Sequence, residues 1–122
     1  MKILITHANN FDFVDELYNP LRKSQLNQDH DFILPHESDV FIVTKPLLKN
    51  KEVQMVIAEV SNASTGEGIE LGWADVFSVP VICIYKKGTN YSKSLNAITN
   101  IFIEYENSDD MIAKIDMYIK SL

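Results

Sequence analysis

Short apolar runs alternate along this chain with segments whose apolar residues recur at helical spacing. An unbroken apolar run is typical of a strand that is buried on both faces, and Met55-Val56-Ile57-Ala58 is the clearest example. The pattern predicts about five strands, over residues 2–6, 31–34, 53–60, 79–85 and 101–103.

The segments between these runs carry helical signals. Phe11, Val14, Leu17 and Tyr18 fall at helical spacing, and Asn19-Pro20 fits a cap followed by proline at the first helical position. The predicted helices after that point cover residues 20–27, 44–52, 69–77 and 109–122.

Strands and helices that alternate from end to end favour a doubly wound α/β fold with a parallel sheet in a flavodoxin-like or Rossmann-like order. We expect residues 1–122 to form a single domain. Ligands of such folds bind beyond the carboxyl ends of the strands. Four predicted loops meet there, over residues 6–10, 35–39, 61–68 and 86–96.

Composition narrows the classes of function. The net charge is −6, so a nucleic acid polymer would be repelled, while a mononucleotide held by local backbone dipoles remains compatible. No apolar run approaches the ~20 residues of a membrane span. Cys83 is the single cysteine, and the three histidines show no metal-ligand spacing, so we expect no metal, no cofactor and a cytoplasmic protein.

The segment from Ala58 to Ala74 carries the candidate chemistry. Gly66 and Gly68 are expected to let the backbone bend and approach a ligand, and free N–H groups at the start of the next helix can hold an anion. Ser64 adds a hydroxyl, and Glu70 is predicted within the first helical turn. The dinucleotide fingerprint Gly-x-Gly-x-x-Gly does not follow the first strand.

A carboxylate beside an anion site suits a reaction better than binding alone. A glycosidic carbon gains oxocarbenium character as its bond breaks, and a carboxylate such as Glu70 can stabilise or capture that carbon. The alternative is that Glu70 only complements the helix dipole, which is worth ~0.3–1 kcal/mol.

The run Ala58-Glu59-Val60-Ser61 through Ser64-x-Gly66-x-Gly68-x-Glu70-Leu71-Gly72-x-Ala74 resembles nucleoside 2-deoxyribosyltransferases. It is most similar to their relatives, the 2′-deoxynucleoside 5′-monophosphate N-glycosidases. The resemblance implies that Glu70 is the nucleophile and that Ser64 binds a 5′-phosphate. It also implies a homodimer in which a loop of the neighbouring subunit completes the site, here with Asn96 at the position of a serine.

Two departures from that family affect the expected site. The first loop, Thr6 to Asn10, lacks the usual glycines, and we expect Thr6 and His7 to contact the substrate there. The family's aspartate that assists the leaving base falls on Pro46, and a second acidic position falls on Gln54.

Substitutes for the missing acid lie directly after a predicted strand. His36 and Glu37 could reach the pocket, with Glu37 as the acid, although such pairs are also common polar loop residues. His7 either hydrogen-bonds the substrate or is satisfied by backbone groups.

The sequence therefore predicts an enzyme that cleaves the N-glycosidic bond of a (deoxy)nucleoside 5′-monophosphate or nucleoside through Glu70. One alternative is base exchange between nucleosides. The other is a nucleotide-binding protein that is not catalytic because it lacks the acid.

Overall fold

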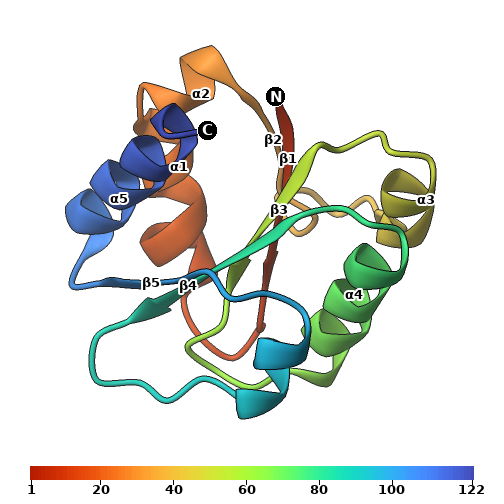
Figure 1. The fold of residues 1–122 in the computed structure, drawn as a ribbon. Helices are drawn as coiled ribbons and strands as arrows, with labels where there is room; N and C mark the ends of the chain where they lie inside the picture. Colours follow the sequence, from red (N-terminus) through yellow and green to blue (C-terminus); the bar gives the residue numbers. More distant parts are fainter.

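The computed structural model describes residues 1–122 as one five-stranded sheet with helices on both faces (Figure 1). The strands are β1 (Lys2–His7), β2 (Asp31–Ile33), β3 (Met55–Glu59), β4 (Val81–Lys86) and β5 (Phe102–Tyr105). The helical elements are η1 (Val14–Tyr18), α1 (Asn19–Lys23), α2 (Leu26–Asp29), α3 (Thr44–Lys49), α4 (Thr65–Val76), η2 (Lys93–Ala97) and α5 (Ser108–Lys120).

All neighbouring strands pair in parallel, in the order β2-β1-β3-β4-β5. The chain passes from β1 outward to β2, and from β3 outward to β4 and β5, so the winding direction changes between β1 and β3. The register there pairs His7 with Glu59 at the carboxyl ends. The predicted doubly wound α/β fold is confirmed, and a ligand crevice is expected beside this pair.

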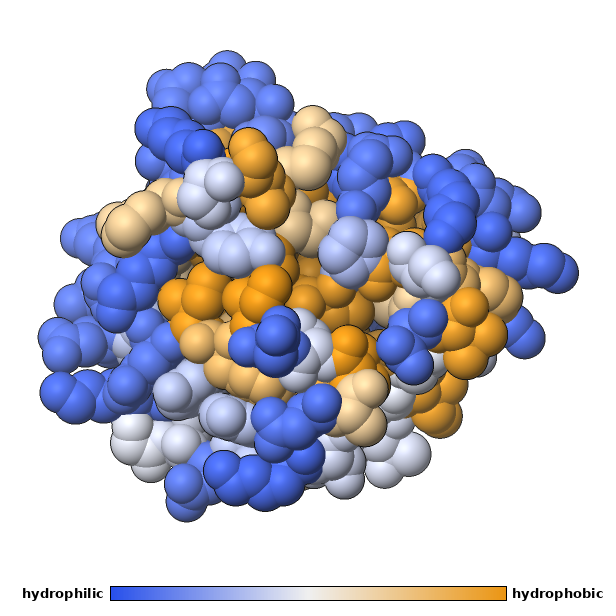
Figure 2. Space-filling model, viewed as in Figure 1, coloured by the Kyte–Doolittle hydropathy of each residue, from blue (hydrophilic) through white to orange (hydrophobic).

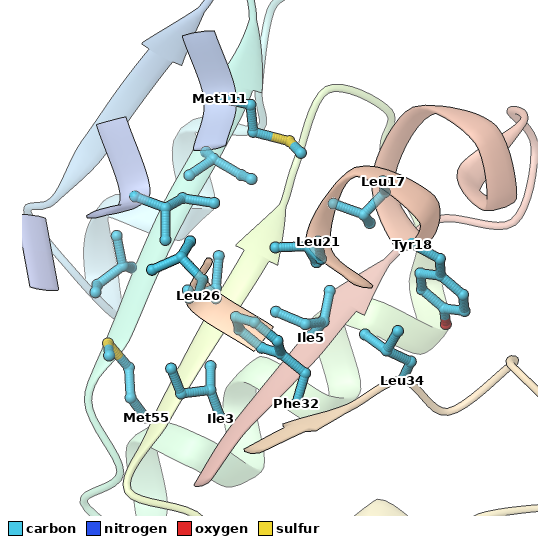
Figure 3. Packing of buried hydrophobic residues seen from close by; sticks show 14 of the residues in the cluster. Ile3, Ile5, Leu17, Tyr18, Leu21, Leu26, Phe32, Leu34, Met55 and Met111 are labelled. Atoms are coloured by element: carbon cyan, nitrogen blue, oxygen red, sulfur yellow. The ribbon is translucent and has the colours of Figure 1, made fainter. Parts of the chain in front are cut away.

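Alternate side chains of each strand enter two separate cores. On one face, Ile3, Ile5 and Ile57 belong to a cluster of 15 buried residues under η1, α1, α2 and α5. Figure 3 shows this packing, with the Tyr18 hydroxyl directed away from the apolar side chains. On the other face, Leu4 and Val56 belong to a cluster of 11 buried residues under α3 and α4.

The helix expected over residues 20–27 is two short helices. Ser24 is extended between α1 and α2, and its hydroxyl donates a hydrogen bond of 2.7 Å to the Leu21 carbonyl oxygen. A side chain that bonds to its own backbone competes with helix continuation, which explains the break.

The helix expected from residue 69 begins four residues earlier, at Thr65. Ser64 is its N-cap, and the Ser64 hydroxyl oxygen accepts a hydrogen bond of 3.3 Å from the Glu67 amide. Gly66 and Gly68 therefore lie inside the helix and neither has a positive φ. The expectation that these glycines form a sharp turn is wrong, because a capped helix already accommodates them.

One face of the molecule has an apolar centre and polar margins. In the space-filling view, hydrophobic residues reach the surface in the middle of this face and hydrophilic residues crowd its edges (Figure 2). No helix is both long and apolar enough to cross a membrane.

Candidate active site

A cleft of about 470 Å³ lies at the carboxyl ends of β1 and β2, beside the first two turns of α4. Its walls come from the end of β1, the segment between β2 and α3, and one face of α4. His7, Ser64, Glu67 and Glu70 are among the lining residues. The cleft therefore occupies the crevice where doubly wound sheets bind ligands.

Glu70 lies on α4 and faces this cleft. Its Oε2 accepts a hydrogen bond of 2.7 Å from the Thr44 hydroxyl at the start of α3, and it forms no ion pair with a lysine or arginine. Burial raises the pKa of Glu70, while the Thr44 hydrogen bond and the charge of His36 act in the opposite direction. The carboxyl group is thus half-buried, oriented and unpaired.

Glu67 lies one turn before Glu70 and is almost completely buried, at 4% exposure. Its Oε2 accepts a hydrogen bond of 2.9 Å from the Thr6 hydroxyl at the end of β1. Burial raises the pKa of Glu67 to about 8, the Thr6 hydrogen bond opposes that shift, and the charges of Glu59 and Glu70 add to it. This shift favours the protonated form of the Glu67 carboxyl at neutral pH.

Sequence reasoning missed Glu67, although two signals pointed to it. Ser64-x-x-Glu67 has the spacing of a capping box, which would have marked the helix start. Glu67 and Glu70 are also three residues apart, so they share one face of the helix. The Glu67 side chain does not close the capping box but reaches Thr6 in the sheet.

His7 is buried, and both of its ring nitrogens have partners. Nδ1 lies 2.7 Å from the Ala8 carbonyl oxygen, and Nε2 lies 2.7 Å from the Tyr18 hydroxyl. The Tyr18 hydroxyl oxygen also accepts a hydrogen bond of 3.1 Å from the His36 amide. Burial lowers the pKa of His7 and raises that of Tyr18 to about 12, so a neutral imidazole accepts from a phenol.

Aromatic rings gather around His7 in the cleft wall. The His7 ring lies 4.4 Å from the Phe13 ring and 5.4 Å from the His36 ring, between centroids. Of the two interpretations of His7, the satisfied histidine matches these contacts better. The His7 and His36 side chains line the cleft as part of an aromatic wall.

The anion site expected around Ser64 differs in its donors. The Gly68 amide donates to the Ser64 carbonyl oxygen at 3.0 Å, so it is used inside the helix. The Thr65 and Gly66 amides precede the first intrahelical donor and stay free. Gly66 lines the cleft, whereas Gly68 lines a second hollow of about 410 Å³ between α4 and η2.

Glu37 and Asn96 lie outside the cleft. Glu37 forms a bidentate ion pair with Arg22, in which the Nε–Oε2 and Nη2–Oε1 distances are both 2.7 Å. The hydrogen bonds from Arg22 lower the pKa of Glu37. Such an ion pair does not favour a proton-donating role. Asn96 is exposed on η2, where its side chain donates a hydrogen bond of 3.1 Å to the Lys93 carbonyl oxygen.

Two remaining polar groups have structural partners. The buried Glu59 carboxylate accepts hydrogen bonds from the Ser61 amide, the Ser61 hydroxyl and the Tyr105 hydroxyl, which ties the loop after β3 to β5. Cys83 is buried, and its pKa is raised to about 12 by burial. No group of three His, Cys, Asp or Glu side chains is placed to hold a metal ion.

No family model matches the chain, and no curated protein matches it. Among solved structures, the chain is similar to the CMP N-glycosidase BcmB of Clostridium botulinum, with a TM-score of 0.61 and 20% sequence identity. The similarity covers 95% of this chain and 99% of that one. The two proteins therefore share their fold over nearly their whole length, in agreement with the resemblance noted in the sequence.

Proposed function

We propose that this protein cleaves the N-glycosidic bond of a (deoxy)nucleoside 5′-monophosphate or nucleoside, with Glu70 as the nucleophile. One observation carries the proposal. The Glu70 carboxyl faces the cleft at the carboxyl edge of the sheet, held by the Thr44 hydroxyl at 2.7 Å and free of any ion pair. The fold that the chain shares with a CMP N-glycosidase supports this choice of reaction.

In the first step, a Glu70 carboxylate oxygen bonds to the anomeric carbon C1′ while the bond from C1′ to the base nitrogen breaks. The electron pair of that bond and one proton go to the departing base. In the second step, water adds to C1′, the bond to Glu70 breaks, and the carboxylate is restored with loss of a proton from the water. The products are a free base and a sugar or sugar phosphate.

The start of α4 would hold the 5′-phosphate. The free Thr65 and Gly66 amides lie at the positive end of a 12-residue helix, and the Ser64 hydroxyl lies beside them. The raised pKa of Glu67 supports this arrangement for the substrate-binding state, because a neutral carboxyl at that position does not repel an arriving anion.

We also propose that two copies of the chain form the working enzyme, with Asn96 of each copy at the cleft of the other. Asn96 is exposed and lies outside its own cleft, which is compatible with a contact to the cleft of another copy. A cytoplasmic site of action accords with the free, buried Cys83. Sedimentation measurements on the wild type and on Asn96→Asp test the assembly.

The test of the reaction is release of free base from a panel of deoxynucleoside and ribonucleoside 5′-monophosphates and the matching nucleosides. The wild type should release base, and Glu70→Gln should not, while both keep the same thermal unfolding profile. Repeating the assay with a second free base separates hydrolysis from base exchange. Nucleotide binding without any turnover, unchanged in Glu70→Ala, would contradict the enzymatic assignment.

A further inference from the structure

The proposed nucleophilic role of Glu70 assigns no chemistry to Glu67, the second glutamate of the cleft. It is a carboxyl side chain at 4% exposure with no cationic partner. One oxygen accepts the Thr6 hydrogen bond at 2.9 Å. The other, Oε1, has no hydrogen-bond partner in the chain and is not sealed from solvent. A carboxyl group buried this deeply, with one oxygen open, is placed to exchange a proton with a bound molecule.

Glu67 also lies near Glu70, the proposed nucleophile. Glu67 and Glu70 are separated by three positions on α4 and line the same cleft. Such a spacing sets Cβ atoms ~5–6 Å apart on one helix face. Two carboxyl side chains at one cleft are also what retaining glycosidases use, one as nucleophile and the other as acid and then base.

Glu67 also borders a second hollow of the protein. Glu67 and Ser64 line both the cleft and the second hollow of about 410 Å³ behind the start of α4. Ser92, Ser94 and Asn62 also line that hollow, so its rim offers hydrogen-bonding groups to water. Glu67 thus borders both the cleft and this second hollow.

We propose that Glu67 is the proton donor of the reaction and takes the place of the family's missing aspartate. This inference rests on the proposed function. In the first step, the Glu67 O–H bond breaks and its proton goes to the base nitrogen as Glu70 bonds to C1′. In the second step, the Glu67 carboxylate takes a proton from water, the water oxygen bonds to C1′, and the C1′–Glu70 bond breaks. Both carboxyl groups return to their starting states.

The groups that face Glu67 come from several elements and agree with a protonated resting state. Glu59 on β3 and Glu70 on α4 are negative when ionised and raise the pKa of Glu67. The charge of Glu67 when ionised also raises the pKa of Cys83 on β4. Thr6 on β1 is the one neighbour that favours the ionised form.

The experiment compares two leaving groups in the wild type and in Glu67→Gln. A natural deoxynucleotide has a base that needs a proton to leave, whereas 4-nitrophenolate on the same sugar phosphate leaves as an anion. For Glu67→Gln we expect the natural substrate to lose ~10²–10⁴-fold in kcat/KM and the aryl substrate to keep its first step. The variant should then release one burst of nitrophenolate and stall with an adduct on Glu70. Added azide, which attacks without giving up a proton, should restore turnover.

Controls keep the result interpretable. Glu104→Gln changes an exposed carboxyl group on β5 and should leave both substrates unaffected. Thermal unfolding confirms that Glu67→Gln is folded. If it is not, the wild type alone still decides, because kcat/KM for the natural substrate should fall above pH about 8 and that for the aryl substrate should not.

Several results would overturn the inference. The first is a wild-type kcat/KM of Glu67→Gln on the natural substrate. The second is an equal loss of kcat/KM on the natural and the aryl substrate. The third is that Glu37→Gln, and not Glu67→Gln, shows the loss that depends on the leaving group. In each of these cases Glu70 still forms its adduct in the wild type, so the proposed function stands. If the wild type forms no adduct with the aryl substrate, the proposed function fails first and the role of Glu67 fails with it.

Discussion

The Thr6 hydroxyl and the Glu67 carboxyl group are joined by a buried hydrogen bond of 2.9 Å that links the carboxyl end of β1 to the first turn of α4. A matching bond of 2.7 Å joins the Thr44 hydroxyl to Glu70. Glu67 and Glu70 thus each accept a hydrogen bond from one threonine hydroxyl. Two conservative threonine variants can therefore perturb the two carboxyl groups separately.

Replacing Thr44 by valine should act directly on Glu70. The hydroxyl favours the charged carboxylate, so its loss raises the pKa of Glu70 further and moves the acidic limb of the kcat/KM profile to higher pH. A hydrogen bond to a charged group is worth ~1.5–3 kcal/mol, so kcat/KM should fall about tenfold or more. Thr44→Ser keeps the hydroxyl and should stay close to the wild type. An acidic limb that does not move would separate Glu70 from the rate.

Replacing Thr6 by valine should act on the opposite limb. The Thr6 hydrogen bond lowers the pKa of Glu67, so its loss should carry that pKa above the wild-type value of about 8. If Glu67 donates the proton, the basic limb moves to higher pH while the acidic limb stays in place. Thr6→Ser is the matched control. A Thr6→Val profile that shifts at its acidic limb would speak against the assignment of Glu67.

The pH dependence of stability should expose Glu67 without any substrate. Its folded pKa of about 8 lies above the reference value of 4.5, so between these two values the folded protein binds the extra proton. Stability from this group is fully present below pH 4.5 and is lost as pH rises toward 8. Glu67→Gln removes that loss, which we expect to be on the order of a few kcal/mol. Thermal unfolding at pH 5 and pH 8 should therefore show the variant gaining on the wild type at the higher pH.

Replacing Ser64 by alanine should separate nucleotides from nucleosides. The hydroxyl is expected to bind the 5′-phosphate, so KM for a nucleoside monophosphate should rise about tenfold while KM for the nucleoside changes little. Because Ser64 caps α4 through a long bond of 3.3 Å, the loss of stability should be near the lower end of ~0.5–2 kcal/mol. Ser64→Thr should restore phosphate discrimination. Equal KM changes for both ligands would place the phosphate elsewhere.

The fold could be predicted from the sequence because the apolar runs are unambiguous. Met55 to Ala58 is apolar without interruption, and the observed strand covers Met55–Glu59 with every residue buried. The start of α4 was harder to predict, because two closely spaced glycines, Gly66 and Gly68, suggest a turn and not a helix. Only the Ser64 cap, with its partner at the Glu67 amide, shows that a helix accommodates both glycines.

The site could be predicted only in part, for a physical reason. Glu70 was identifiable as a candidate from its motif and its predicted place near the start of a helix. Glu67 carries the same side chain, but its hydrogen-bond partner is Thr6, a residue 61 positions earlier in the chain. Glu37 illustrates the converse, because its place after β2 suggested a cleft residue while Arg22 on α1 holds it in an ion pair. Long-range partners of this kind leave no trace in local sequence spacing.

The central claim is that Glu70 forms a covalent bond to the sugar. Mass spectrometry of the protein quenched during turnover of the aryl deoxyribofuranoside phosphate tests it most directly. The account predicts a mass increase of one deoxyribosyl phosphate on the peptide that contains Glu70, absent in Glu70→Gln. A turning-over wild type with no adduct, or an adduct on another residue, would contradict it.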